Sequence, residues 1–322
     1  MNTVRWGVMG AAKIARTQLC PAIHVAAGGT LTALASRSAE KSDPFTRQYP
    51  GLKIHTGYEA LLADPDIDAI YIPLPNDMHV DMTLACLAAG KHVLCEKPIA
   101  MAAGQIDGLI AQREKTGLLA AEAFMVVHHP QWARVRKILQ SGEIGALSHV
   151  SGVFTYNNAD KPTNFRNHSS QGGGGLPDIG VYPVVTTRFA TGAEPTDIRA
   201  NIDWLDGVDL SAHVMATFPG FTMDFYCSMR MGLRQEMLFH GTNGWIRVLA
   251  PFNPDSYADG QLEIRLKDGS SRIERYGETN QYQLMIEAFN RSVTLGEPFA
   301  CTLEFSRENQ AMIDQIIAAD PP

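Results

Sequence analysis

The sequence lacks a long apolar run. No stretch approaches the roughly 18 consecutive apolar residues that a membrane-spanning helix needs. The first residues enter a strand pattern directly, without a basic segment and an apolar leader before it. We therefore expect a soluble, cytoplasmic protein.

Positive charge is also scarce. The chain has 27 Lys and Arg residues against 34 Asp and Glu residues, which gives a net charge of −7, and no long basic run offsets this average. Nucleic acids and anionic membrane surfaces are bound through basic patches. We expect neither kind of partner.

Cysteine is sparse and scattered. The five cysteines form no C-x-x-C pair, and the ten histidines show no spacing typical of metal ligands. This pattern argues against a disulfide framework and predicts reduced thiols and no metal site. The cysteines are Cys20, Cys86, Cys95, Cys227 and Cys301.

The first part of the sequence alternates between predicted strands and predicted helices. At 322 residues the chain exceeds one typical core, so we expect two domains. The alternation predicts βαβ units and a parallel sheet. The predicted strands are Val4–Met9, Leu31–Ala35, Ala69–Ile72, His92–Cys95 and Leu118–Ala121, and the predicted helices are Ile14–Val25, Met78–Ala89 and Ala103–Thr116.

The pattern changes after His128-His129-Pro130, where one helix leads into a series of alternating, β-rich segments. Asn243-Gly244 is a hairpin-turn signal between two of them. The predicted strands are Ala146–Tyr156, Val214–Phe218, Thr222–Cys227, Glu236–Phe239 and Trp245–Leu249, followed by helices over Tyr282–Val293 and Leu303–Ala318.

The fold class that follows is α/β. We predict a Rossmann dinucleotide-binding domain at residues 1–124 and an α+β domain at residues 125–322, built on a large, mostly antiparallel open sheet. The last helix can pack back on the first domain.

A small-residue turn follows the first predicted strand. Gly10, Ala11, Ala12, Lys13 and Ile14, with Ala15 after them, fit G-x-A-x-x-A between a strand and a helix. Such a turn lets the backbone approach a pyrophosphate, which the helix N-terminus favours. We predict that these residues bind a dinucleotide, although small residues also occur at such turns for packing alone.

The end of the second strand predicts which dinucleotide is bound. Ser36 and Arg37 stand there with no carboxylate to bind a ribose 2′-hydroxyl. A serine and an arginine suit a 2′-phosphate, so NADP is favoured. The alternative is a solvated Arg37 with Glu40 as the ribose partner of NAD.

Two further strand ends carry polar residues. Glu96 and Lys97 follow the strand His92–Cys95, where a lysine costs solvation energy unless a ligand needs it. Leu74, Asn76 and His79 follow the strand Ala69–Ile72, and we predict that they lie near the nicotinamide. For His79, a local hydrogen bond at a helix N-terminus is an equal alternative.

A run of four glycines precedes a second polar helix. Gly172 to Gly175 predict a flexible loop, and Pro177 suits the first turn of a helix. Asp178 and Tyr182 are then spaced i and i+4 and share one helix face. Arg166, in the preceding loop, could contact a substrate or simply be solvated.

These motifs together resemble the glucose-fructose oxidoreductase, inositol dehydrogenase and rhizopine catabolism family (Gfo/Idh/MocA). The chain is most similar to the branch with glucose-fructose oxidoreductase, dihydrodiol dehydrogenase and NADP-dependent xylose dehydrogenase. The matching segments are the turn at Gly10, Pro75-Asn76-Asp77-Met78-His79, Glu96-Lys97-Pro98, Glu122-Ala123-Phe124-Met125, His129-Pro130-Gln131, Gly172 to Tyr182 and Gly241-Thr242-Asn243-Gly244. Ala12 departs from a usual glycine, and Val126 and Val127 depart from an aromatic and a basic residue.

The resemblance implies an NADP-dependent oxidoreductase, with NAD also accepted as a cofactor, acting on a sugar, a polyol or a related diol. It places the catalytic tyrosine at Tyr182. A tyrosine, with a reference pKa of about 10, is a poor base unless a nearby cation favours the phenolate. We therefore expect Tyr182 to be the acid/base, Lys97 to assist it and Asp178 to orient the substrate.

Two other functions stay open for this fold. One is NAD-dependent glycoside hydrolysis, and the other is cofactor sensing without catalysis. The resemblance also implies a homodimer or homotetramer formed through the open sheet of the second domain.

Overall fold

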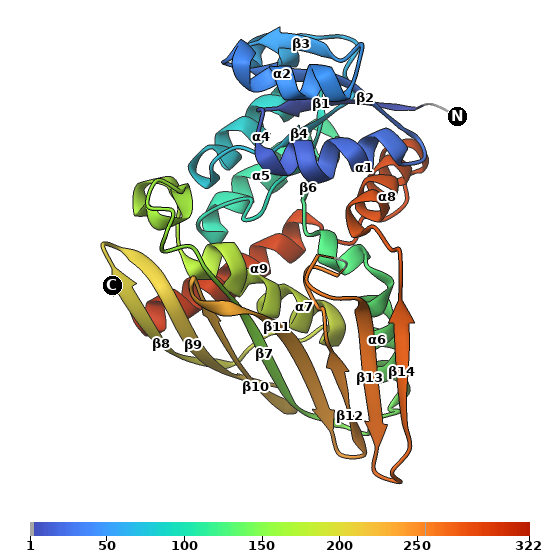
Figure 1. The fold of residues 1–322 in the computed structure, drawn as a ribbon, viewed down its shortest axis with the longest axis vertical. Helices are drawn as coiled ribbons and strands as arrows, with labels where there is room; N and C mark the ends of the chain where they lie inside the picture. Colours follow the sequence, from blue (N-terminus) through green and yellow to red (C-terminus); the bar gives the residue numbers. More distant parts are fainter. Residues whose placement is uncertain (1–2, 255) are drawn as a thin grey trace. The chain divides into compact units, whose positions relative to one another are not determined.

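The computed structural model describes residues 3–254 and 256–322, which form two compact units (Figure 1). The first unit contains the described chain up to Met125 together with Asn280–Arg307. The second contains Val126–Thr279, apart from residue 255, and Glu308–Pro322. Within these described residues, we find no helix of the length and hydrophobicity that a bilayer crossing requires.

The first unit is built on a six-stranded parallel sheet with the order β3-β2-β1-β4-β5-β6. The order reverses between β1 and β4, and in such sheets ligands bind beyond the carboxyl ends of the strands at this point. The strands are β1 (Val4–Met9), β2 (Gly29–Ser36), β3 (Lys53–Thr56), β4 (Ala69–Ile72), β5 (His92–Cys95) and β6 (Ala120–Glu122).

Helices pack on both faces of this sheet (Figure 1), which explains why β4 and β5 are almost continuously apolar. A π-helical segment, Ala15–Leu19, runs directly into α1. The helices are α1 (Cys20–Val25), α2 (Ala39–Gln48), α3 (Tyr58–Leu62), α4 (His79–Ala88), α5 (Ala103–Thr116) and α8 (Gln281–Leu295).

Helix α8 belongs to the first unit, although residues 125–322 were all predicted to form the second domain. The reason is packing against the start of β1. The ring of Phe289 lies 4.9 Å from the ring of Trp6, centroid to centroid, and the Trp6 indole N–H donates to Asn290 Oδ1 at 2.9 Å. Such contacts between residues far apart in the chain leave no mark in local sequence patterns.

The second unit is built on an eight-stranded sheet with the order β14-β13-β12-β11-β7-β10-β9-β8. All neighbouring pairs are antiparallel except β7 and β10, so the predicted fold class is confirmed. The strands are β7 (Leu147–Asn157), β8 (Asp197–Leu205), β9 (Val208–Phe218), β10 (Phe221–Ser228), β11 (Arg230–Gly241), β12 (Gly244–Val248), β13 (Gly260–Leu266) and β14 (Ser271–Tyr276).

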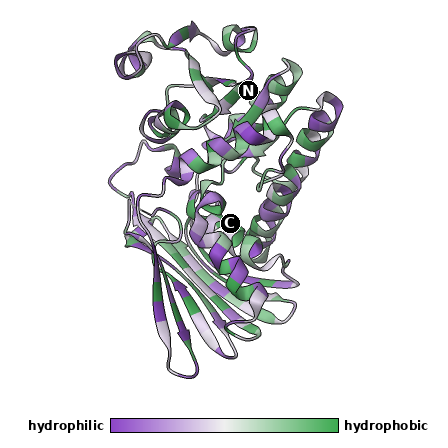
Figure 2. Cartoon of the chain, turned by 90° about the vertical axis from the view of Figure 1, so that its right-hand side faces the viewer, coloured by the Kyte–Doolittle hydropathy of each residue, from purple (hydrophilic) through white to green (hydrophobic). Residues whose placement is uncertain are grey.

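One face of this sheet is covered by α6 (Pro130–Ser141) and α7 (Val181–Thr191) (Figure 1). Buried and exposed side chains therefore alternate along β9 and β10. Figure 2 shows hydrophobic and hydrophilic residues alternating along strands of this sheet. The last helix, α9 (Leu303–Ala319), begins in the first unit and continues into the second.

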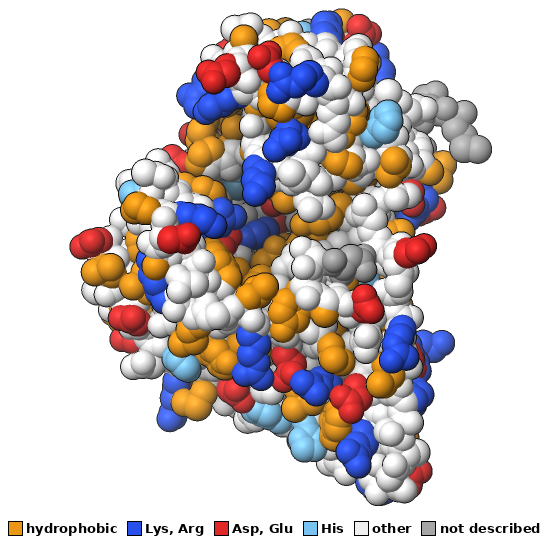
Figure 3. Space-filling view, viewed as in Figure 1, with side chains coloured by type: hydrophobic (Ala, Val, Ile, Leu, Met, Phe, Trp, Pro, Cys, Tyr) orange, Lys and Arg blue, Asp and Glu red, His pale blue; other side chains and the backbone are white. Residues whose placement is uncertain are grey.

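Charges of both signs are interspersed over the face shown in Figure 3.

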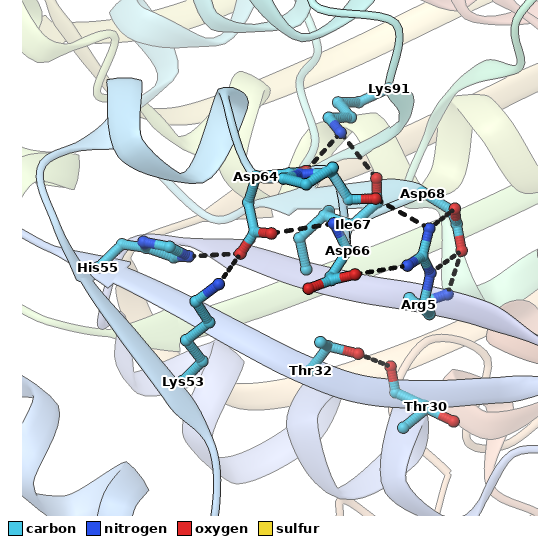
Figure 4. Close-up of polar contacts among 11 residues, drawn as sticks. Arg5, Thr30, Thr32, Lys53, His55, Asp64, Asp66, Ile67, Asp68 and Lys91 are labelled. Atoms are coloured by element: carbon cyan, nitrogen blue, oxygen red, sulfur yellow. Dashed lines mark hydrogen bonds and ion pairs between the residues drawn. The ribbon is translucent and has the colours of Figure 1, made fainter.

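A cluster of charged residues lies at the amino-terminal edge of the parallel sheet (Figure 4). The buried Lys91 side chain donates to the carbonyl oxygens of Asp64 and Ile67 at 2.7 and 2.8 Å. The Asp64 carboxylate binds Lys53 Nζ at 2.8 Å and His55 Nε2 at 2.7 Å. Because β3 and β5 begin at or next to Lys53 and Lys91, this cluster lies at the edge away from the expected ligand site.

Asp64 makes the stability of this unit depend on pH. The hydrogen bond from Lys53 and the N–H of Asp66 hold the pKa of its carboxyl well below the usual range. A lowered pKa in the folded state stabilises the fold above the ordinary carboxyl pKa of about 3.9, and this stabilisation is lost as the pH falls. We expect Asp64→Asn to lower the Tm by about 2–4 °C at pH 7. Thermal unfolding followed by circular dichroism should show the difference from the parent protein shrinking toward pH 3.

The matched control is Asp66→Asn, because the Asp66 side chain is 67% exposed and pairs with Arg5 at the surface. It should leave the Tm almost unchanged. Equal losses from Asp64→Asn at both pH values would contradict the role given to the carboxylate.

Candidate active site

Gly10 forms the turn at the carboxyl end of β1. Its φ is +120°, which glycine adopts readily and other residues do not, and its N–H donates to the carbonyl of Ala35 at 2.9 Å. A Cβ at this position would lie 2.9 Å from Leu74 Cδ2. Glycine is therefore required both for the turn and for the close approach of Leu74, and the narrow turn fits a backbone that approaches a pyrophosphate.

Four predicted cofactor residues follow this turn. Ala11, Ala12 and Ile14 are partly exposed and Lys13 is exposed. They lead into the π-helical segment that begins at Ala15. The π-helical conformation is rare in proteins overall, and where it occurs it is often at a functional site.

Ser36 and Arg37 lie at the end of β2 as predicted, but only one of them presents its side chain outward. The Ser36 hydroxyl donates to the Ser38 carbonyl at 2.8 Å, so its one proton is used within the local turn. The Arg37 side chain is exposed, and its guanidinium lies 5.9 Å from the centroid of the Tyr58 ring. Arg37 is thus the better candidate to bind a phosphate.

His79 is fully buried at the start of α4. Its Nδ1 lies 2.7 Å from the Pro98 carbonyl oxygen, and its Nε2 lies 2.8 Å from the Leu74 carbonyl oxygen. The ring therefore ties the chain after β4 to the chain after β5. Neighbouring Asn76 is also buried, in a short 3-10 turn.

Glu96 and Lys97 directly follow β5, at the same carboxyl edge as Gly10. Tyr71, on the adjacent strand β4, donates its hydroxyl to Glu96 Oε1 at 2.5 Å. Burial, and then the nearby Glu96 carboxylate, raise the pKa of Tyr71 well above its ordinary value, so it remains a neutral donor. Glu96 is thereby held in place, while Lys97 is partly exposed and the Lys97-Pro98 peptide bond is cis.

Glu122 supports the same turn from β6. Its Oε1 accepts the backbone N–H of Ile99 at 2.8 Å, and its side chain is buried. Burial raises the pKa of this carboxyl to about 7, although the N–H of Ile99 and the Lys97 cation oppose the shift. Sequence patterns gave Glu122 no role, because its partner is 23 residues away in the chain.

Asp178 lies in a π-helical segment, Leu176–Gly180, that leads into α7. Its two carboxylate oxygens bind different partners: Arg166 Nε lies 2.8 Å from Oδ1, and the Tyr156 hydroxyl donates to Oδ2 at 2.7 Å. Burial, and then the Asp178 charge, raise the pKa of Tyr156 above its ordinary value. The open question about Arg166 is thus answered in part, because its guanidinium pairs with Asp178.

Tyr182 occupies the first turn of α7 and is 6% exposed. Its ring packs against Phe154 and Phe252, each with a centroid 5.4 Å away, and these two rings also stack on each other. Asp178 and Tyr182 belong to one continuous helical stretch, as predicted, although its first part is π-helical. The Arg166 guanidinium also lies within electrostatic range of Tyr182.

The structure thus gathers the predicted residues into two groups. Gly10 to Ile14, Leu74, Asn76, His79, Glu96 and Lys97 follow the carboxyl ends of β1, β4 and β5 in the first unit, with Ser36 and Arg37 at the end of β2. Asp178 and Tyr182 lie together in the second unit. In the part of the chain that the structure describes, no three histidine, cysteine or acidic side chains gather as a metal site.

Two family models match the chain. Residues 4–124 match the NAD-binding Rossmann fold of the GFO_IDH_MocA oxidoreductase family, and residues 132–247 match the GFO/IDH/MocA C-terminal domain. The chain belongs to the Gfo/Idh/MocA family. Its enzymatic nature follows, since this is a family of oxidoreductases, and the predicted family resemblance is confirmed.

Individual relatives agree with this assignment. A D-xylose 1-dehydrogenase (NADP(+)) of Haloferax volcanii is 31% identical over 98% of this chain and 95% of its own length. A trans-1,2-dihydrobenzene-1,2-diol dehydrogenase of Xenopus tropicalis is 32% identical over 76% of this chain and 74% of its own.

A solved structure is also similar: KijD10, a 3-ketoreductase from Actinomadura kijaniata in complex with NADP and TDP-benzene. It superposes with a TM-score of 0.90 and 30% identity, covering 99% of this chain and 98% of that one. KijD10 has also been solved with one lysine replaced by alanine and with one tyrosine replaced by phenylalanine. The predicted nicotinamide dinucleotide, NADP or NAD, is confirmed at the level of the family and its NADP-bound relatives.

Proposed function

We propose that this Gfo/Idh/MocA oxidoreductase transfers a hydride between NADP and a carbinol or carbonyl carbon of a sugar, a polyol or a related diol. The observation that carries the proposal is the position of Lys97, which follows β5 at the carboxyl edge where the Gly10 turn also lies. A lysine is favourable there when a ligand oxygen needs it. The names of the NADP-dependent relatives support the substrate class.

The cofactor supplies the hydride chemistry when it is bound. The backbone of Gly10 to Ile14 holds the pyrophosphate, and Arg37 binds the 2′-phosphate. Leu74, Asn76 and Glu96 shape the nicotinamide end. His79 lies between the carbonyl oxygens of Leu74 and Pro98, and its neutral ring donates a hydrogen bond to one of them.

Tyr182 takes the hydroxyl proton during oxidation and returns it to the carbonyl oxygen during reduction. Lys97 binds the same oxygen, and its cation favours the phenolate. Asp178 binds Arg166 and Tyr156 through its two carboxylate oxygens and orients a substrate hydroxyl. Arg166 and Tyr156 thereby fix the direction in which Asp178 accepts.

We also propose that the enzyme works in the cytoplasm. The five cysteines are all free and buried, which agrees with a reducing cytoplasm.

Large apolar side chains, including Met215 (60% exposed) and Leu233 (59%), lie on strands β9 and β11 of the second-unit sheet. We propose a homodimer or homotetramer through this sheet. Light scattering should then give a mass of two or four chains, and Met215→Glu should lower it; a monomeric parent protein would contradict this assembly.

The reaction is tested by absorbance at 340 nm with NADP and with NAD, against aldoses, inositols, anhydro-sugars, diols and keto-sugars. We expect turnover with one substrate class and NADP. Glycoside cleavage without net NADPH or NADH formation, or cofactor binding without any turnover, would contradict the proposal and favour hydrolysis or sensing.

The roles of the two proposed catalytic residues are tested in the same assay. Tyr182→Phe should lower kcat by about 100-fold or more, because it removes the group that exchanges the proton. Lys97→Met should lower kcat similarly, and in the oxidation direction it should move the rising limb of the pH profile to higher pH, because the phenolate loses its cation. Near-normal turnover in Tyr182→Phe would remove this residue from the role.

The cofactor preference is tested with Arg37→Ala. A guanidinium bound to a phosphate is worth a charge-assisted hydrogen bond or more, so the Kd for NADP should rise by about 10- to 100-fold while the Kd for NAD stays unchanged. Isothermal titration calorimetry gives both values. The matched control is Arg47→Ala, an exposed arginine in α2. An unchanged ratio of the two Kd values in Arg37→Ala would contradict the NADP assignment.

A further inference from the structure

We propose that Asp209 is the positioning residue of the segment that carries Asp178 and Tyr182. It anchors the start of this segment through backbone N–H groups. The inference rests on the proposed function, because it assigns no chemistry to Asp209 and concerns only where the two proposed active-site residues are held. Sequence patterns gave this residue no role.

The anchor is a buried hydrogen bond between distant parts of the second unit. Asp209 lies in β9 and is only 3% exposed. Its Oδ2 accepts the backbone N–H of Leu176 at 2.5 Å, and its carboxyl also accepts from the backbone of Gly175. Leu176 begins the π-helical segment that contains Asp178, so the contact is made at the first residue of the segment.

The glycine run fits around this carboxyl. A Cβ at Gly174, whose φ is +143°, would collide with Asp209 Oδ1, and a Cβ at Gly175 would lie 3.3 Å from Oδ2. On the other side, a Cβ at Gly173 would lie 2.5 and 2.6 Å from the carbonyl oxygens of Arg166 and Phe165. The expected flexible loop is thus a closely packed one, in which glycines let the backbone approach Asp209.

A buried carboxyl is a costly anchor. Burial raises the pKa of Asp209 to about 7, although the N–H groups of Leu176 and Gly175 oppose the shift. The titratable groups that face it are Asp178, whose charge raises the pKa of Asp209 further, and the thiol of Cys227 on β10. Two carboxyls near one another weaken the fold, so stability alone is a poor reason for this arrangement.

A role in positioning the segment that carries Asp178 and Tyr182 explains why a carboxyl is buried at this place. The helical stretch that Asp209 anchors continues without interruption through Asp178 and Tyr182. A displacement of its first residue therefore moves both of the proposed active-site residues. Displacements of about 1 Å can lower a rate by about 100-fold even when no catalytic group is lost.

The test is Asp209→Asn. The amide has the size of the carboxyl, but its nitrogen donates and cannot accept, so one oxygen is left to accept the N–H groups that two oxygens now serve. We expect kcat to fall by about 10- to 100-fold. The Kd for NADP should stay unchanged, because the predicted cofactor residues lie in the other unit. Hydrogen exchange, measured by mass spectrometry, should become faster in a peptide covering residues 172–182.

Asp203→Asn is the matched control, because Asp203 is exposed on the adjacent strand β8. It should change none of the three measurements. A folded Asp209→Asn protein with parent-like kcat, or with parent-like exchange at residues 172–182, would overturn the inference.

Two further measurements keep the outcomes separate. If Asp209→Asn does not fold, exchange in the parent protein decides, because anchored amides at Gly175 and Leu176 must be strongly protected and unprotected amides would overturn the inference. If Tyr182→Phe has parent-like kcat, the proposed function fails instead. Exchange at residues 172–182 then decides whether Asp209 anchors the segment.

Discussion

A buried carboxyl that accepts backbone N–H groups is the interaction on which both parts of the candidate site depend. In the first unit, Glu122 accepts the N–H of Ile99, two residues after Lys97. In the second unit, Asp209 accepts the N–H of Leu176, two residues before Asp178. In each case a side chain from one strand fixes the backbone of a turn that carries a candidate residue. A backbone anchor of this kind restrains the turn while leaving the candidate side chain available for a substrate.

The parallel sheet separates stabilising charges from functional ones. At its amino-terminal edge, Lys91 donates to the backbone carbonyl oxygens of Asp64 and Ile67, and the Asp64 carboxylate binds the side chains of Lys53 and His55 (Figure 4). These charged groups are therefore bound within the fold. At its carboxyl edge, Glu96 is held by one phenol and Lys97 remains partly exposed. Because all strands of a parallel sheet point the same way, every βα turn adds a residue to the second edge, and a site can be assembled there from distant motifs.

Local sequence patterns predicted those features that depend on residues close together in the chain. The bounds of β1, β4, β5 and α5 follow from apolar runs and turn residues, and the glycine at the end of β1 predicted the cofactor turn. Helix α2 was not predicted, because its segment contains Pro44 and has too few apolar residues to show a helical pattern. Strand β3 was missed because it is a short, exposed edge strand.

Long-range contacts explain the remaining differences. Asp209 and Leu176 are 33 residues apart, and Trp6 and Asn290 are 284 apart, so no local pattern reveals either pair. Ser36 was assigned to a phosphate from its residue type alone, whereas its hydroxyl proton is used by Ser38 in the turn. Residue types predict which chemistry is available, but only the fold shows which donors are already occupied.

The same distinction separates the two tyrosines beside Asp178. Tyr156 donates its proton to this carboxylate, and burial with the neighbouring charge raises its pKa, so it cannot act as a base near neutral pH. Tyr182 lies instead among aromatic rings. An apolar surrounding disfavours a phenolate, so a tyrosine base there requires a compensating cation. The proposed role of Tyr182 therefore depends on neighbouring positive charge: the Arg166 guanidinium already interacts electrostatically with this tyrosine, and the proposed mechanism adds the Lys97 cation.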